Sequence, residues 1–187
     1  MTTKHYTVDP DLTGIAERQL ADLEARRPDA PPKLVTTVRS DALQNLQLRA
    51  TVEGHSFLAD EPMAKGGHDA GPAPLRYFLG GLIMCHQVWF IKAAVRRRIE
   101  IVTLSGAISG FSGALESTSD DALGRPLSRF DYDMTVESPA AVDQVREAVE
   151  EALRFCPAMA TVLQSTPLRL TLTLGGEQVH ARTYGGR

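Results

Sequence analysis

The chain contains two cysteines, Cys85 and Cys156, and these thiols are its strongest candidates for covalent chemistry. A thiolate attacks electrophiles such as a peroxide oxygen, and two cysteines that meet can close and reopen a disulfide. Two cysteines are too few for the disulfide framework of a small secreted protein. In a reducing compartment they are therefore either buried apolar side chains or a redox pair.

Cys156 is predicted to lie at a joint between two helices. An amphipathic helix over 139–155, with Ser138 as its N-cap, ends directly before the cysteine. Pro157 then suits the first position of a second short helix, which continues over 158–164. The free amides at the start of that helix would point back toward the sulfur, so this position favours a thiolate.

Cys85 lies in the middle of a helix predicted over 75–97. Most of that segment is apolar, and a helix that is apolar all round is usually buried all round. We therefore expect a central helix covered on both sides. Gly80 and Gly81 each cost about 1 kcal/mol relative to alanine in a helix, which predicts that another backbone approaches closely there. Arg96, Arg97 and Arg98 are expected to form its solvated C-terminal end.

The remaining elements must position these two helices. A charged amphipathic helix over 9–27 and a proline-rich linker form an N-terminal arm, residues 1–32, before a single domain at 33–187. Glycine and proline crowd the segment 60–74, which is predicted to be an irregular loop, and a polar loop is predicted over 116–126. Strands are predicted over 34–39, 46–52, 56–59, 99–112, 127–137 and 168–174, the first three as an antiparallel meander.

The stretch from residue 55 to residue 85, together with Cys156-Pro157, resembles the OsmC-like family over roughly 34–175. The resemblance also extends to the order of elements, with a glycine-rich loop before a long helix and a second helix that ends in Cys-Pro. It depends on His55, Phe57, Asp60-Glu61-Pro62, Gly66-Gly67, Asp69, Gly71-Pro72, Pro74-Leu75, Leu79, Leu82 and Cys85.

The resemblance implies an α+β fold, the OsmC-like fold, with antiparallel sheets wrapped around a long central helix. It also implies an intertwined homodimer with active sites at the dimer interface. The implied activity is that of a peroxidase that reduces organic hydroperoxides without a cofactor. Cys85 would attack the peroxide and become a sulfenic acid, Cys156 would condense with it, and an external dithiol would reduce the disulfide.

Peroxidases of this family also use an arginine in the N-terminal strand region. The candidates are Arg39, which we prefer because it stands at a strand end, and Arg49, expected to be solvated. A glutamate that orients the arginine is replaced here by Leu75, and Glu61 could substitute for it if the loop folds back. The missing glutamate favours an alternative, a non-catalytic binding module that holds a hydrophobic small molecule at the dimer interface. The presence of both cysteines favours the peroxide reductase.

Other classes of function fit the sequence less well. The formal net charge of −3 argues against a nucleic-acid binder. No apolar run reaches the ~20 residues of a membrane span, and the first residues lack the apolar stretch of a signal peptide, so we expect a cytoplasmic protein. His55, His68 and the Cys85-His86 pair could suggest a metal site. Adjacent helical residues point about 100° apart, however, so we expect no metal there.

Overall fold

The computed structural model describes residues 6–27, 29–112 and 126–186. The chain divides into two compact units. The first unit comprises residues 1–24 and 81–187, and the second comprises residues 25–80. Most of the polar loop predicted over 116–126 lies outside the described residues.

The first unit is built on a four-stranded sheet, ordered β4 (Thr103–Ser112), β5 (Leu127–Glu137), β6 (Leu168–Leu174), β7 (Glu177–Tyr184). Strands β5 and β6 pair in parallel, whereas the other two pairs are antiparallel. The prediction of purely antiparallel sheets is therefore wrong here. Two helices, α3 (Val142–Phe155) and α4 (Pro157–Val162), connect β5 to β6, and a crossover of this length permits parallel pairing.

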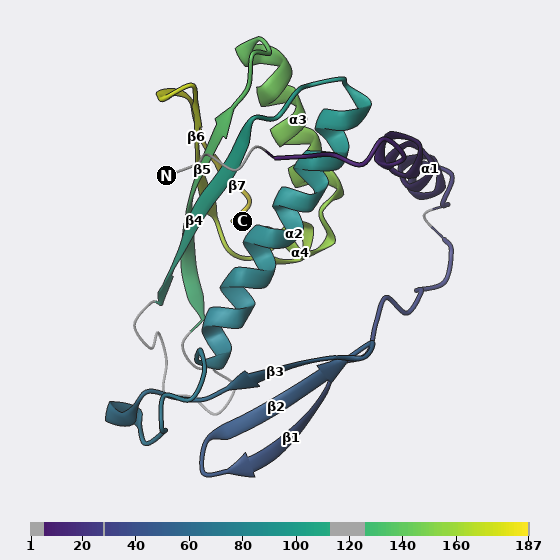
Figure 1. Cartoon of the computed structure of the whole chain (residues 1–187). Helices are drawn as coiled ribbons and strands as arrows, with labels where there is room; N and C mark the ends of the chain where they lie inside the picture. The colour runs from purple at the N-terminus through teal and green to yellow at the C-terminus, as the bar shows by residue number, and fades with distance from the viewer. Residues whose placement is uncertain (1–5, 28, 113–125, 187) are drawn as a thin grey trace. The chain divides into compact units, whose positions relative to one another are not determined.

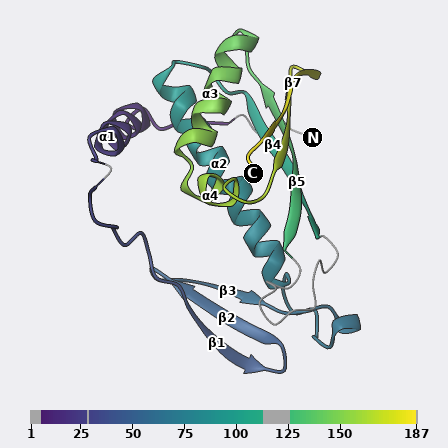
Figure 2. The same ribbon diagram turned by 180° about the vertical axis from the view of Figure 1, so that it is seen from behind.

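The helices α2 (Pro74–Arg96), α3 and α4 lie on one face of this sheet, as the two opposite views show (Figures 1 and 2). The buried residues between the sheet and the helices recur at the spacing expected of a strand or a helix. In β5 every second residue from Phe130 to Val136 is buried, and in α3 the buried residues include Val145, Ala148, Val149 and Ala152. The predicted strand over 99–112 is shorter than expected, and the predicted helix over 9–27 is observed as α1 (Leu12–Glu24).

Three local predictions for the first unit are wrong. Helix α2 is not buried all round, because Met84 is 60% exposed and Val88 is 47% exposed. At Gly81 an added Cβ would meet nothing within 4 Å, so the predicted close approach of another backbone is wrong for Gly81, and for Gly80 it stays a prediction. Helix α3 begins at Val142, with Ala141 as its N-cap, because Ser138 instead accepts a hydrogen bond from the N–H of Ala140 at 3.1 Å.

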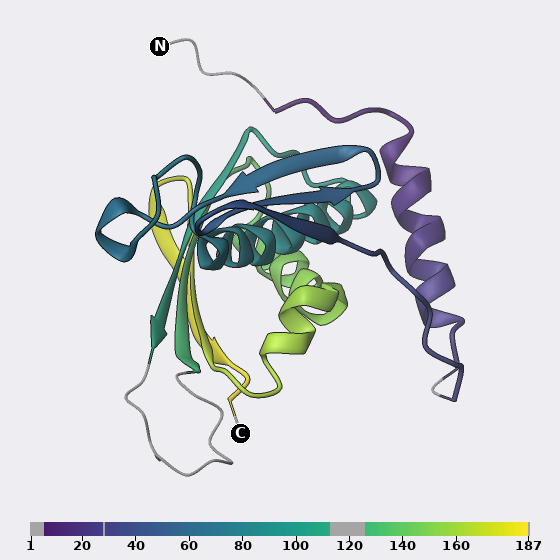
Figure 3. The same cartoon turned by 90° about the horizontal axis from the view of Figure 1, so that it is seen from below.

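The second unit contains an antiparallel three-stranded meander, β1 (Arg39–Gln44), β2 (Gln47–Val52), β3 (His55–Ala59), drawn in blue in Figure 3. The strand predicted over 34–39 is wrong, since regular structure begins only at Arg39. The turn through Asn45, which has a φ of 49°, sets the register, so that β1 pairs with β2 only from Arg39 onward.

An irregular loop follows β3, as predicted, with one short 3-10 turn, η1 (Met63–Lys65). The buried carboxylate of Asp60 organises the loop, since it accepts hydrogen bonds from the N–H groups of Glu61 at 2.8 Å, His68 at 3.0 Å and Ala70 at 3.3 Å. Burial alone would raise the pKa of Asp60, but the three backbone donors outweigh it and the pKa is lowered. The loop also needs its glycines: a Cβ on Gly71 would lie 2.5 Å from the carbonyl oxygen of Leu58.

Candidate active site

The two cysteines meet in the first unit. Cys85 comes from the middle of α2, and Cys156 comes from the joint between α3 and α4. Their Sγ atoms lie 3.3 Å apart, and both thiols are free. A disulfide is about 2.05 Å long, so an approach of little more than 1 Å would allow the bond to form. The Cys156 thiol donates toward the Cys85 sulfur.

The two thiols lie in different environments. Cys85 is half-buried, whereas Cys156 is completely buried. Burial raises the pKa of the Cys156 thiol to about 12, and the N–H of Met159, which donates to the sulfur at 3.5 Å, offsets this only in part. The prediction that the start of α4 favours a thiolate at Cys156 is therefore wrong, because desolvation outweighs the helix amides.

A buried polar pair lies in the same core. His86 and Tyr132 are both completely shielded from solvent, and the Tyr132 hydroxyl lies 3.4 Å from Nδ1 of His86. Burial lowers the pKa of His86 to about 4, and burial also raises the pKa of Tyr132. Both side chains are therefore neutral at physiological pH. Among the described residues, no three His, Cys, Asp or Glu side chains are grouped to hold a metal ion.

An aromatic pair lies beside the cysteines in sequence and links their helices. Trp89 lies one turn after Cys85 in α2, and Phe155 directly precedes Cys156. The two rings stack with centroids 6.2 Å apart and an interplanar angle of 28°. A cation lies over each ring: Nζ of Lys92 is 4.5 Å from the Trp89 centroid, and the guanidinium of Arg154 is 4.5 Å from the Phe155 centroid.

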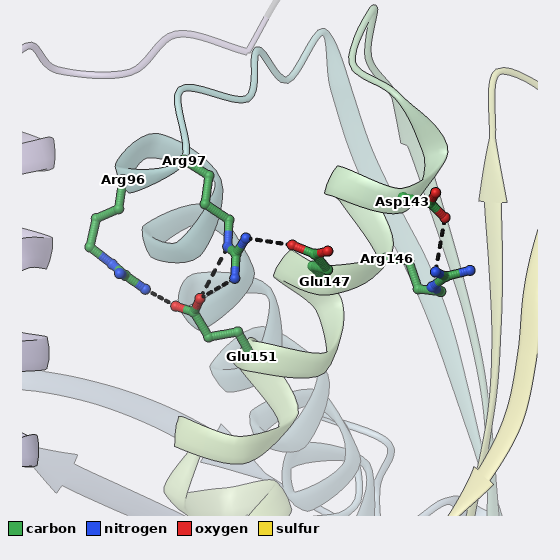
Figure 4. Close-up of polar contacts among 6 residues, drawn as sticks. All are labelled: Arg96, Arg97, Asp143, Arg146, Glu147 and Glu151. Carbon is green, nitrogen blue, oxygen red and sulfur yellow. Dashed lines mark hydrogen bonds and ion pairs between the residues drawn. The ribbon is translucent and has the colours of Figure 1, made fainter.

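Ion pairs join the C-terminal end of α2 to the middle of α3 (Figure 4). Arg97 contacts Glu147 at 2.8 Å and Glu151 at 3.0 Å, and Arg96 also pairs with Glu151. The prediction of a solvated arginine run is therefore wrong for Arg96, which is half-buried, whereas Arg97 and Arg98 are exposed. The two cysteines come from α2 and from the end of α3. These ion pairs between the two helices therefore help to hold the two sulfur atoms in their relative positions.

The other predicted site residues belong to the second unit. Arg39 is the first residue of β1 and Arg49 lies within β2, and both are exposed. Glu61 is half-buried in the loop, and Leu75 in the first turn of α2 is 53% exposed. In the described part of the chain, no ion pair includes Arg39, Arg49 or Glu61. Their roles beside the cysteines stay predictions.

Two features of the site were not predicted from the sequence. Lys92 and Trp89 were assigned only to a buried helix, although their spacing of seven and four residues from Cys85 places all three on one helix face. Tyr132 was assigned only to a strand. Tyr132 lies in the core beside His86, and no sequence pattern indicates that these two side chains meet.

Comparison with known proteins assigns the family. The sequence model of OsmC-like proteins matches residues 66–171, more than half of the chain. No curated protein matches the chain. Among solved structures, an OsmC-like protein from Mycoplasma pneumoniae is similar with a TM-score of 0.64 at 17% identity, over 76% of this chain and 99% of that one.

Organic hydroperoxide resistance proteins share the fold as well. The protein from Elizabethkingia anophelis has a TM-score of 0.56 at 12% identity, over 79% of this chain and 100% of that one. The protein from Legionella pneumophila has a TM-score of 0.54 at 14% identity, over 77% of this chain and 98% of that one. With its α+β fold and the match over residues 66–171, this chain belongs to the OsmC-like protein family.

Proposed function

We propose that this protein is a cysteine-based peroxide reductase that prefers organic hydroperoxides. The observation that carries the proposal is the contact of 3.3 Å between a half-buried Cys85 and a completely buried Cys156. An attacking thiol must be reachable by substrate, and a resolving thiol must only reach its partner. The family and the neighbours named for hydroperoxide resistance support the same reading.

The first step takes place at Cys85. Its thiolate attacks one peroxide oxygen, so that an S–O bond forms and the O–O bond breaks. The peroxide is reduced to an alkoxide, which takes up a proton and leaves as the alcohol. Cys85 is thereby oxidised to a sulfenic acid.

The second step uses the proton that burial keeps on Cys156. The Cys156 sulfur attacks the sulfur of the Cys85 sulfenic acid, an S–S bond forms and the S–O bond breaks. The hydroxide that leaves takes the proton of Cys156 and departs as water. An external dithiol then reduces the disulfide and restores both thiols, which requires a reducing compartment such as the cytoplasm.

We also propose that the active form is a homodimer. Met84 and Val88 flank Cys85 in α2 and are 60% and 47% exposed in the single chain. Exposed apolar side chains beside a reactive centre are typical of a surface that another polypeptide covers. A second copy would bury this part of α2, and an apolar surround suits an organic peroxide better than hydrogen peroxide. Sedimentation equilibrium that gives a monomer at micromolar concentration would contradict the dimer.

Titration with peroxide tests the catalytic proposal. The reduced protein receives one equivalent of cumene hydroperoxide, free thiols are counted, and disulfides are mapped by mass spectrometry. We expect rapid loss of two thiols and a Cys85–Cys156 bridge. Cys85→Ser should abolish peroxide consumption, whereas Cys156→Ser should consume one equivalent and stop at a sulfenic acid that dimedone traps. Two thiols still free after long exposure would refute the proposal.

A binding module on the same fold is the second candidate, because an exposed Leu75 stands where a glutamate was expected. The cysteines would then be inert lining beside a hydrophobic small molecule. The oxidant diamide separates the two readings, since it closes neighbouring thiols without a peroxide site. A bridge that forms with diamide but not with hydroperoxide would favour the binding module.

A further inference from the structure

Lys92 lies on the same face of α2 as Cys85. It follows Cys85 by seven residues, and seven steps of about 100° bring it back to within about 20° of the same direction. Trp89 lies between them on this face. Helical side chains lean toward the N-terminus of the helix, so Lys92 extends back toward Trp89 and Cys85. Its Nζ accordingly lies over the Trp89 ring, 4.5 Å from the centroid.

Lys92 differs from the other cations near the end of α2. Arg96 and Arg97 are neutralised by Glu147 and Glu151. In the described ranges, Lys92 forms no ion pair with a carboxylate. Burial lowers the pKa of Lys92, and the negative charge that Cys85 can carry opposes this shift. Lys92 and Cys85 are therefore close enough to interact electrostatically.

The remaining titratable groups beside the two thiols do not compete for this role. His86 and Tyr132 are buried and neutral, and Cys156 keeps its proton. The guanidinium of Arg154 lies over Phe155, the other ring of the aromatic pair, and its side chain is exposed. Lys92 is therefore the half-buried cation on the helix face of Cys85 that no described carboxylate neutralises, since Arg96, on the same face, pairs with Glu151.

We propose that Lys92, held over Trp89, is a positioning residue that supplies positive charge to the thiolate of Cys85 from within the first unit. Trp89 keeps the ammonium desolvated and in place, because a cation is attracted to the face of an indole ring. This inference deepens the proposed function. It explains how a chain with Leu75 in place of the glutamate could still stabilise a reactive thiolate at Cys85. The charge of Lys92 would act independently of any stabilisation by Arg39 or Arg49.

The test measures the Cys85 thiolate without any peroxide. All variants carry Cys156→Ser, so that Cys85 is the only thiol, and the rate of alkylation by iodoacetamide is recorded from pH 5 to pH 10. Lys92→Met keeps the apolar stem over Trp89 and removes the charge, Lys92→Arg restores the charge, and Arg154→Met removes the neighbouring cation as a matched control. Circular dichroism establishes that each variant is folded.

We expect Lys92→Met to slow alkylation at pH 7 by about fivefold and to move the midpoint of the pH profile upward by roughly half a unit or more. Lys92→Arg should stay within about twofold of the parent, and Arg154→Met should leave the profile unchanged. An unchanged profile in Lys92→Met would overturn the inference, as would an equal shift in Arg154→Met. If Lys92→Met does not fold, Lys92→Arg still tests the inference, because it keeps the positive charge. An upward shift of roughly half a unit in the pH midpoint of Lys92→Arg would overturn the inference.

The outcomes for the two proposals can be told apart. If Cys85 alkylation depends on Lys92 but the wild-type protein consumes no hydroperoxide, the proposed function fails and the electrostatic role of Lys92 stands. If the protein consumes hydroperoxide, and Lys92→Met changes neither the rate of that consumption nor the alkylation profile, the role of Lys92 is refuted and the proposed function stands.

Discussion

Protonation of His86 should destabilise the first unit as the pH falls below about 6.5. The imidazole is completely buried, and its Nδ1 lies 3.4 Å from the Tyr132 hydroxyl. Burial lowers its pKa to about 4, well below the usual value near 6.5 for histidine. The unfolded chain therefore takes up this proton before the folded chain does. The contribution of neutral His86 is fully present above pH 6.5, declines as the pH falls, and is lost once the pH reaches about 4.

The size of the effect follows from the two pKa values. A difference of about 2.5 units at about 1.4 kcal/mol per unit gives a loss of roughly 3 kcal/mol in the free energy of unfolding between pH 7 and pH 4. Loss of carboxylate interactions in acid adds to this for any variant, so the measurement must be a difference. His86→Gln removes the titrating group and keeps a polar side chain in the cavity.

Urea unfolding at pH 7, 6, 5 and 4.5, followed by the fluorescence of the single tryptophan, Trp89, reports on the first unit directly. We expect wild type to be more stable than His86→Gln at pH 7 and to lose that advantage by about 1 kcal/mol per pH unit below pH 6. Tyr132→Phe is the control. It keeps His86 buried, so the slope should persist because desolvation is the main cause. Parallel curves for wild type and His86→Gln across the whole range would refute the reasoning.

Two further substitutions test the packing that positions the site. Gly71→Ala should unfold the loop of the second unit at a cost above about 1 kcal/mol, because the new Cβ would lie 2.5 Å from the Leu58 carbonyl oxygen, and hydrogen exchange over residues 58–72 would show it. Glu151→Gln should lower the free energy of unfolding by about 1–3 kcal/mol, since the side chains of Glu151 and Arg96 are only 15% and 16% exposed. Asp143→Asn, which removes an exposed pair within α3, should cost under about 0.5 kcal/mol, and equal losses in urea unfolding would contradict both estimates.

Strongly periodic segments were predictable from the sequence. Strands β5 and β6 have the predicted bounds, and α2 differs by one residue at each end, since their apolar residues follow a period of two or fill a long uninterrupted segment. Strand β7 was missed because it is a polar edge strand in which no residue is fully buried. The first strand was placed too early because its register depends on the turn at Asn45 rather than on the β-branched residues before it.

The candidate site, like the fold, was predictable from the sequence only in part. The two cysteines could be singled out because the motif and the helix ends mark them. The environment of Cys156 could not, since complete burial depends on side chains of α2, α3 and the sheet that only the tertiary structure brings together. The spacing of Lys92 from Cys85 would have allowed the two to be placed on one helix face, but a half-buried lysine over an indole ring appears only once the packing of Trp89 on Phe155 is known.

The unequal burial of the two thiols fixes the order in which they can react. Burial raises the pKa of Cys156 well above its usual range, so that very little of it is thiolate at pH 7, and a peroxide would have to reach a completely buried sulfur. Cys156 is therefore a poor first nucleophile. The same low thiolate fraction is tolerable in the second step, because the partner sulfur is already 3.3 Å away and effective concentrations of about 10⁵ M or more are available to groups held in contact. Burial that would disable an attacking thiol thus suits the resolving role proposed for Cys156, which in that reaction would keep its proton until the hydroxide leaving Cys85 could accept it.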